Sequence, residues 1–177
     1  MLSNMKEGMD VIAELIAIAA KSSPSSLNES FTDISILDEA EKEMLVEEMY
    51  QMADEKEDET YTEVSEDIEQ SEKVILIGLD DHHSIGLDCK ACGYESCEIL
   101  ERSDQKKDIF EGPNCLFKVM DIGTSLGYAL QSANRNNVYA SISIKGGLAA
   151  KNLGLSTSRL CVAIQINTKS KEFSFGI

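Results

Sequence analysis

The chain has 177 residues, and its net charge of −16 argues against nucleic acid as a partner, because phosphate binding needs a basic surface. With 42% hydrophobic residues it is long enough for one domain with an apolar core, but its longest apolar run is too short and too interrupted by charge to span a membrane. Because residues 1–20 lack the basic start of a secretory signal, we expect a cytoplasmic protein, where thiols stay reduced and clustered cysteines serve metal or redox chemistry.

The charge is unevenly distributed along the chain. Residues 29–70 carry seventeen Asp and Glu against two Lys, whereas residues 112–177 carry seven Lys and Arg against two acids. The acidic stretch is typical of a solvated helix face, with a docking surface for a basic redox partner or packing against the basic half as alternatives. We therefore expect a mainly helical acidic part over residues 1–72 and an α/β part over residues 73–177, together forming one compact domain.

The N-terminal part has the periodicity of helices. Apolar residues recur at helical spacing over residues 5–21, and a Ser- and Pro-containing loop follows. Weak alternation up to residue 36 indicates a short strand. Asp38 is a plausible N-cap of a second helix that reaches about residue 53. Residues 54–61 are too charged to bury, which predicts a loop or a frayed helical end, and residues 64–70 predict a further short helix.

The second part mixes strands and helices. Val74-Ile-Leu-Ile-Gly78 is a short continuous apolar run, typical of a strand buried on both faces. Further strands are predicted over residues 138–144, 160–166 and 173–177, and helices over residues 98–110, 116–133 and 146–153. The expected fold class is α+β or α/β, with a mixed sheet of about three to five strands flanked by helices and a cysteine-rich metal loop after the buried strand.

Four cysteines form the motif that carries the chemistry. Cys89, Cys92 and Cys97 fall within nine residues, and Cys115 follows after Gly112-Pro-Asn. Thiolates are soft ligands that suit an iron–sulfur cluster or a tetrahedral zinc. Structural zinc more often uses two matched pairs of ligands, so the three-plus-one spacing favours [4Fe–4S] over zinc. Gly93 would let the backbone pass close to inorganic sulfide.

These residues resemble a known family. The run Gly86-Leu-Asp-Cys89-Lys-Ala-Cys92-Gly-Tyr-Glu-Ser-Cys97-Glu, with Gly112-Pro-Asn-Cys115, is similar to uncharacterised ferredoxin-domain proteins of mostly anaerobic prokaryotes. The spacing also resembles the single-cluster module of the Rnf electron-transport B subunit and of corrinoid iron–sulfur proteins. The resemblance implies that the four cysteines are cluster ligands and lends no reaction. Residues 168–177 depart from the family's usual C-terminal motifs, so any function of that tail stays open.

A weaker resemblance points to flavin-dependent nitroreductases. A Ser-Pro loop after the first helix, a glycine-bearing helix after Asp121 and a Leu-Gly-Leu turn at residues 153–155 are similar to those enzymes. Nitroreductases hold the FMN phosphate with arginines, often near the N-terminus. Because the first arginine here is Arg102, only Lys6 and Lys21 could serve there.

Two other features are explained by ordinary structural roles. The pair His82-His83 lies close enough to Cys89 to be a ligand or a proton donor, but an exposed loop pair is the commoner outcome. Cys161 lies in an apolar strand and should behave as a small buried hydrophobe.

The sequence thus predicts a [4Fe–4S] protein that transfers electrons or senses redox state and meets an unidentified redox protein partner. We expect no catalytic residue; an enzyme would be an oxidoreductase. A structural Zn(Cys)4 interaction module is the alternative, and a nitroreductase-like flavoprotein with FMN and an accessory cluster is the second. A homodimer is possible. The electron donor, the acceptor and any substrate stay open.

Overall fold

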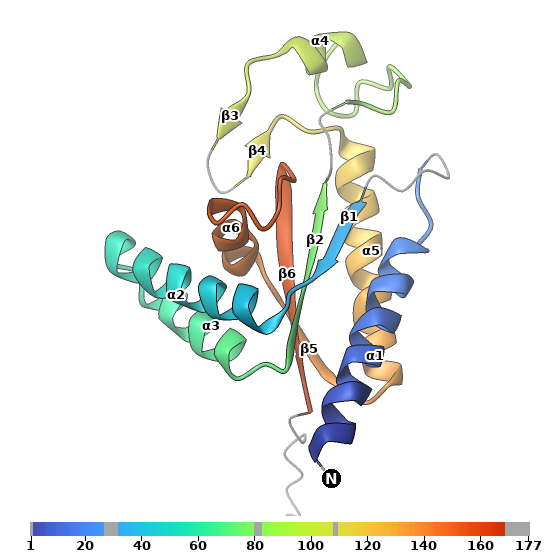
Figure 1. The fold of residues 1–177 in the computed structure, drawn as a ribbon. Helices are drawn as coiled ribbons and strands as arrows, with labels where there is room; N and C mark the ends of the chain where they lie inside the picture. The colour runs from blue at the N-terminus through green and yellow to red at the C-terminus, as the bar shows by residue number, and fades with distance from the viewer. Residues whose placement is uncertain (1, 27–31, 80–82, 108–109, 169–177) are drawn as a thin grey trace, which may run out of the picture.

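The computed structural model describes residues 2–26, 32–79, 83–107 and 110–168. Helices and strands alternate along most of this length (Figure 1). The elements, in chain order, are α1 (Leu2–Lys21), β1 (Thr32–Ile36), α2 (Glu39–Lys56), α3 (Glu59–Glu69), β2 (Lys73–Leu79), α4 (Cys97–Arg102), β3 (Lys106–Lys107), β4 (Glu111–Gly112), α5 (Leu116–Arg135), β5 (Tyr139–Ser143), α6 (Ile144–Asn152) and β6 (Leu160–Asn167).

A four-stranded sheet in the order β1-β2-β6-β5 is the centre of an α+β fold. All three pairings are antiparallel, so the expectation of a mixed sheet is wrong. Every residue of β2 after Lys73 is buried, as is every residue of β6. Continuous apolar runs of this kind are typical of parallel sheets covered on both faces. Here helices cover both faces of antiparallel strands, and the same burial results.

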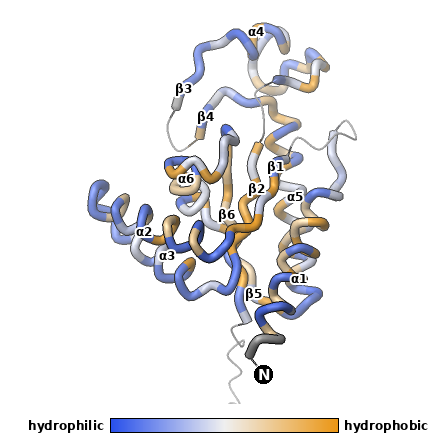
Figure 2. The backbone as a smooth tube through the Cα atoms, in the orientation of Figure 1, coloured by the Kyte–Doolittle hydropathy of each residue, from blue (hydrophilic) through white to orange (hydrophobic). Residues whose placement is uncertain are grey.

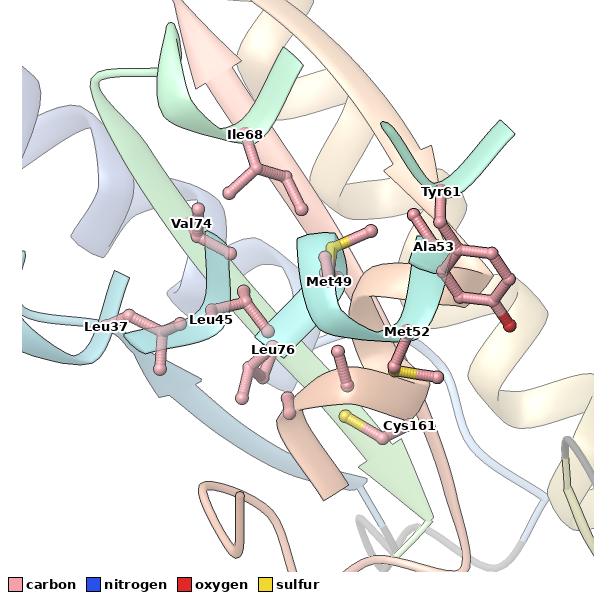
Figure 3. Close-up of a cluster of buried hydrophobic side chains, with 13 residues drawn as sticks. Leu37, Leu45, Met49, Met52, Ala53, Tyr61, Ile68, Val74, Leu76 and Cys161 are labelled. Atoms are coloured by element: carbon pink, nitrogen blue, oxygen red, sulfur yellow. The ribbon is translucent and has the colours of Figure 1, made fainter. Parts of the chain in front are cut away.

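Different sets of helices cover the two faces of the sheet. On one face, α1 and α5 pack side by side over the isoleucines of β2 and β6, among them Ile75 and Ile164 (Figure 1). On the other face, α2, α3 and α6 cover Val74 and Leu76, with Met49 between them (Figure 3). Figure 2 shows hydrophobic residues along the central strands and hydrophilic ones along α2 and α3. The acidic stretch is thus a solvated outer layer.

Asp38 gives α2 its predicted start, but both acidic helices cover residues that were not expected to be helical. Asp38 caps α2 in a capping box, accepting from the Glu41 N–H at 2.9 Å while the Glu41 carboxylate accepts from the Asp38 N–H at 2.9 Å. However, α2 continues to Lys56, and α3 already begins at Glu59. Residues 54–61, expected to be a loop or a frayed helical end, are therefore mostly helical, because the charges point outward while the inner sides of both helices are buried in the core.

Two further predictions need correction, and a third is untested. The helix expected over residues 98–110 is the short α4, and a two-stranded β3–β4 hairpin follows it. The predicted strand at 138–144 and helix at 146–153 become β5 and α6, which begins two residues earlier because the Ser143 hydroxyl accepts from the Gly146 N–H at 2.8 Å. The strand expected over residues 173–177 lies outside the described residues. None of the helices that the structure describes is long and apolar enough to cross a membrane.

Candidate metal centre

The cysteine segment, residues 83–107 and 110–116, lies at one end of the sheet, beyond β2 and next to the N-terminal end of α5 (Figure 1). Cys89 and Cys92 lie in the loop before α4, Cys97 is the first residue of α4, and Cys115 is the N-cap of α5. All four thiols are free. Two helix beginnings and one loop therefore carry the four predicted ligands.

The loop that carries the first two cysteines is made of tight turns. The backbone adopts a positive φ at Gly86, Asp88, Lys90 and Gly93. The Gly93 N–H donates to the Lys90 carbonyl at 2.9 Å, closing a turn around Cys92. A Cβ at Gly93 would meet nothing within 4 Å, so glycine is suited to this position by its φ of 86° and not by lack of space.

A pair of hydrogen bonds joins the loop to α4. The Cys97 N–H donates to Asp88 Oδ1 at 2.7 Å, and the Asp88 N–H donates to Cys97 Sγ at 3.3 Å. The second bond is a backbone donor aimed at sulfur, the kind of interaction that stabilises a thiolate and tunes an iron–sulfur cluster. Asp88, the neighbour of Cys89, is therefore attached to Cys97 across the loop.

Cys92 and Cys115 belong to the same small apolar cluster. Cys115 is buried with Ile85 and Leu100, and Cys92 packs against this cluster together with Tyr94 and Phe117. Cys115 is 6% exposed, Cys92 and Cys97 are half-buried, and Cys89 is exposed. The four thiols thus run from the inside of the segment to its surface.

The four thiols are soft donors, which suit a [4Fe–4S] cluster or a tetrahedral zinc. Within residues 2–26, 32–79, 83–107 and 110–168, no group of three or more His, Cys, Asp or Glu side chains is arranged to hold one metal ion. Four thiols, a backbone N–H on sulfur and a partly apolar wall meet the chemical needs of such a cluster.

His82, His83 and Cys161 are the other residues that the sequence analysis singled out. His82 falls outside the described residues. His83 is 72% exposed, and its Nδ1 lies 3.9 Å from Glu101 Oε2, whose carboxylate also accepts from the Ser84 N–H and hydroxyl. Cys161 is buried in β6, as predicted, and burial raises the pKa of its thiol, which keeps it protonated.

Charges around the cysteines are partly neutralised, which the sequence interpretation missed. Lys90 Nζ lies 2.6 Å from Glu95 Oε2, and Arg102 lies 2.6 Å from Glu98. The second pair has the i, i+4 spacing of helix ion pairs, a signal that was readable from the sequence. Of the acids next to the candidate ligands, Asp88 is the one whose carboxylate accepts a hydrogen bond from the Cys97 backbone.

A buried polar cluster lies just behind the centre and was also missed. Within α5, Lys118 is 1% exposed and Asp121 is buried. The Asp121 carboxylate accepts from the Ser26 N–H at 3.1 Å and from the Ser26 hydroxyl at 2.8 Å, while the Ser125 hydroxyl donates to the Ala20 carbonyl at 2.9 Å. These bonds join the end of α1 to the first turns of α5. Charged residues within an apolar helical pattern were the available signal.

Comparison with known proteins identifies the family. Residues 111–176 match a family described as "uncharacterized protein containing a ferredoxin domain" (DUF2148). An uncharacterized protein of Archaeoglobus fulgidus is 31% identical over 165 residues, covering 93% of this chain and 89% of that protein. The chain belongs to this ferredoxin-domain family. The part of this chain that matches the family, residues 111–176, contains one of the four candidate ligands, Cys115. The other three cysteines precede it.

The fold is that of nitroreductases. The chain is similar to the nitroreductase CinD of Lactococcus lactis, solved with chloramphenicol, with a TM-score of 0.56, 13% identity and coverage of 94% of this chain and 83% of that one. A Desulfovibrio desulfuricans protein described as a nitroreductase and solved with FMN has a TM-score of 0.53 and 16% identity. The likeness covers 94% of this chain and 81% of that one. A BluB-like flavoprotein of Clostridium difficile has a TM-score of 0.52 and 9% identity, with coverage of 93% of this chain and 83% of that one. At sequence identities this low, the likeness shows that this chain shares the fold of those proteins.

Proposed function

We propose that the protein binds one [4Fe–4S] cluster through Cys89, Cys92, Cys97 and Cys115 and uses it to carry single electrons or to sense redox state. The family description as a ferredoxin-domain protein and the three-plus-one spacing support this. The observation that carries it is that Cys92 and Cys115 belong to one apolar cluster, although they are far apart in sequence. The two hydrogen bonds that join Asp88, the neighbour of Cys89, to Cys97 support the assignment of these two cysteines as the other ligands.

Each ligand has a local environment suited to its task. Cys115 begins a 20-residue helix, whose positive N-terminal end favours a thiolate and any added negative charge. Cys97 receives the Asp88 N–H on its sulfur. Ile85 and Leu100 exclude water on the inner side, while the exposed Cys89 leaves an outer side open to a redox protein partner. When bound, the cluster supplies one-electron chemistry.

Metal analysis of a matched pair of variants tests the proposal. Protein prepared without oxygen should contain about four irons and four sulfides per chain. Cys115→Ser should lose most of both, whereas Cys161→Ser, in which a buried cysteine of β6 is changed, should keep them. Full iron and sulfide in Cys115→Ser would exclude this ligand set. One zinc per chain without sulfide would instead establish the structural Zn(Cys)4 module.

The fold favours a second candidate, a nitroreductase-like flavoprotein with the cluster as an accessory. It is supported by the likeness over nine-tenths of the chain to proteins of that class, one of them solved with FMN. Of the two lysines considered for a flavin phosphate, Lys21 already donates to the Thr32 carbonyl at 2.7 Å. Denaturing the purified protein and titrating it with FMN tests this candidate. No released flavin and no binding at micromolar FMN would exclude it.

A further inference from the structure

A groove of about 400 Å³ runs along α2, where this helix lies beside the end of α3. Val46 and Tyr50 supply the apolar part of its lining, and with Lys42 they follow the i, i+4, i+8 spacing of one helix side. Both side chains are half-buried, and Val46 packs against the core beneath. The groove therefore offers an apolar strip on a layer that is otherwise mostly hydrophilic (Figure 2).

Exposed carboxylates line the groove beside this apolar strip. They are Glu43, Glu47 and Asp54 of α2 and Glu69 of α3. The Tyr50 hydroxyl donates to Glu69 Oε2 at 3.4 Å, which places the carboxylate from α3 at the same strip. Desolvation and the carboxylates of Glu69 and Glu66 raise the pKa of Tyr50. The negative potential of both helices thus reaches the apolar lining.

The chain itself does little to neutralise these carboxylates. In the part of the chain that the structure describes, none of the groove's carboxylates on α2 forms an ion pair. Lys42 also lines the groove, but its ammonium donates to the backbone carbonyls of Ser71 at 2.7 Å and Glu69 at 3.3 Å. Glu43 and Glu47 are four residues apart on the helix, a spacing at which like charges repel. A cation from outside the chain would relieve this repulsion.

The charge of the two helices indicates which partner fits. Together α2 and α3 carry twelve Asp and Glu against two Lys, and the whole chain has a net charge of −16. An acidic protein, a nucleic acid or a second copy of this chain is repelled by such a layer. A basic protein segment is attracted, and the apolar stems of its lysines and arginines can lie on the strip while their charged ends meet the carboxylates.

We propose that this α2–α3 groove is a docking site for a basic amphipathic helix of a partner protein. Apolar side chains on one side of that helix would contact Val46 and Tyr50, as in other complexes of a helix in a groove. From Glu43 to Asp54 the acidic side of the groove extends about 16 Å, so it can meet cations spread over about three turns of the partner. No cysteine takes part, so the docking site stands apart from the proposed cluster.

Peptide binding to the full chain, prepared without oxygen, tests the docking site. The probe is a labelled helical peptide of lysine and leucine, about 14 residues long, with its leucines on one side. Fluorescence anisotropy at about 0.15 M salt should give a Kd of about 10–100 μM. Glu47→Lys should weaken binding about tenfold, and Asp54→Lys should act in the same direction. Glu63→Lys makes the same charge change on α3 outside the groove and should weaken it less than about twofold.

A second peptide separates the groove from general charge attraction. It keeps every lysine and replaces each leucine with glutamine, so it should bind at least about tenfold more weakly. Thermal melting should show that all three variants stay folded, since the changed residues are exposed. Equal losses in Glu47→Lys and Glu63→Lys would overturn the proposal, because the whole acidic layer would then attract the peptide. Equal binding of the two peptides, or no binding at about 1 mM, would overturn it as well.

Discussion

The central strands and the cysteine segment are built on opposite principles. In β2 and β6 nearly every residue is buried between two helical layers. Between residues 86 and 99 no residue is fully buried, and the segment's own apolar cluster has only Ile85, Leu100 and Cys115 as buried members. Buried apolar area holds the sheet together without help. The cysteine segment depends on turns, a few hydrogen bonds and its attachment to α5, so we expect its order to depend on the bound cluster.

The largest expected effect breaks the sheet. Ile164 is fully buried in β6 between Ile75 of β2 and Ile142 of β5. Ile164→Ala should lower the free energy of unfolding by about 2–5 kcal/mol, because a cavity replaces packed side-chain atoms. Ile142→Ala changes the residue opposite it, which is 42% exposed, and should cost less than about 1 kcal/mol. Urea denaturation measures both, and equal losses would contradict the two-layer core.

A backbone contact of α6 gives the next effect. A Cβ on Gly147 would lie 2.0 Å from the Cys161 carbonyl oxygen, so Gly147→Ala must push α6 away from β6. We expect a loss of about 1–3 kcal/mol in the free energy of unfolding. Gly8 of α1 has nothing within 4 Å, so Gly8→Ala should stabilise by up to about 1 kcal/mol. Opposite signs in thermal melting are the expected outcome, and equal signs would refute the contact.

Removing the metal should affect the cysteine segment and spare the sheet. Chelation of anaerobically prepared protein should raise amide exchange over residues 83–107 and 110–116 roughly tenfold or more, because little else orders them. Amides of β2 and β6 should change little. Hydrogen exchange followed by mass spectrometry makes this comparison. Unfolding of the whole domain on chelation would mean that the sheet depends on the cluster too.

A smaller effect concerns the reduction potential. Asp88→Asn removes a negative charge beside the ligands, while asparagine can still accept from the Cys97 N–H and tolerates the φ of 47°. Because reduction makes the cluster more negative, the potential should rise on the order of tens of millivolts. Glu95→Gln should shift it less, since Lys90 already pairs with Glu95. A potentiometric titration that ranks the two variants in reverse would refute the assignment.

The smallest effect is a pH dependence far from the cysteines. The Lys145 ammonium, which donates to the Asp58 carboxylate at 2.7 Å, and the Thr60 hydroxyl and N–H lower the pKa of Asp58 to about 2 from 3.8. A depressed pKa stabilises the folded state above pH about 4, and this contribution is lost as the pH falls toward 2. Carboxyl NMR should show the low pKa and its return toward 3.8 in Lys145→Met. An unchanged value would refute the bond.

The sequence predicted more of the fold than of the site. The apolar runs of β2 and β6, the periodicity of α5 and the Asp38 cap were readable because each depends on neighbouring residues. The antiparallel pairing was not, since a run buried on both faces looks the same in either direction. The β3–β4 hairpin was missed because two-residue strands have too few residues to show alternation.

The sequence alone determined the set of candidate ligands and their three-plus-one spacing, since ligand type is a property of the residues themselves. That the four thiols bind a cluster stays a prediction. Tertiary structure alone decided that Cys115 is buried while Cys89 faces solvent, that Lys118 is enclosed, and that the outer side of α5 is left uncovered. The physical reason is that burial is set by packing between segments far apart along the chain, on which local patterns carry no information.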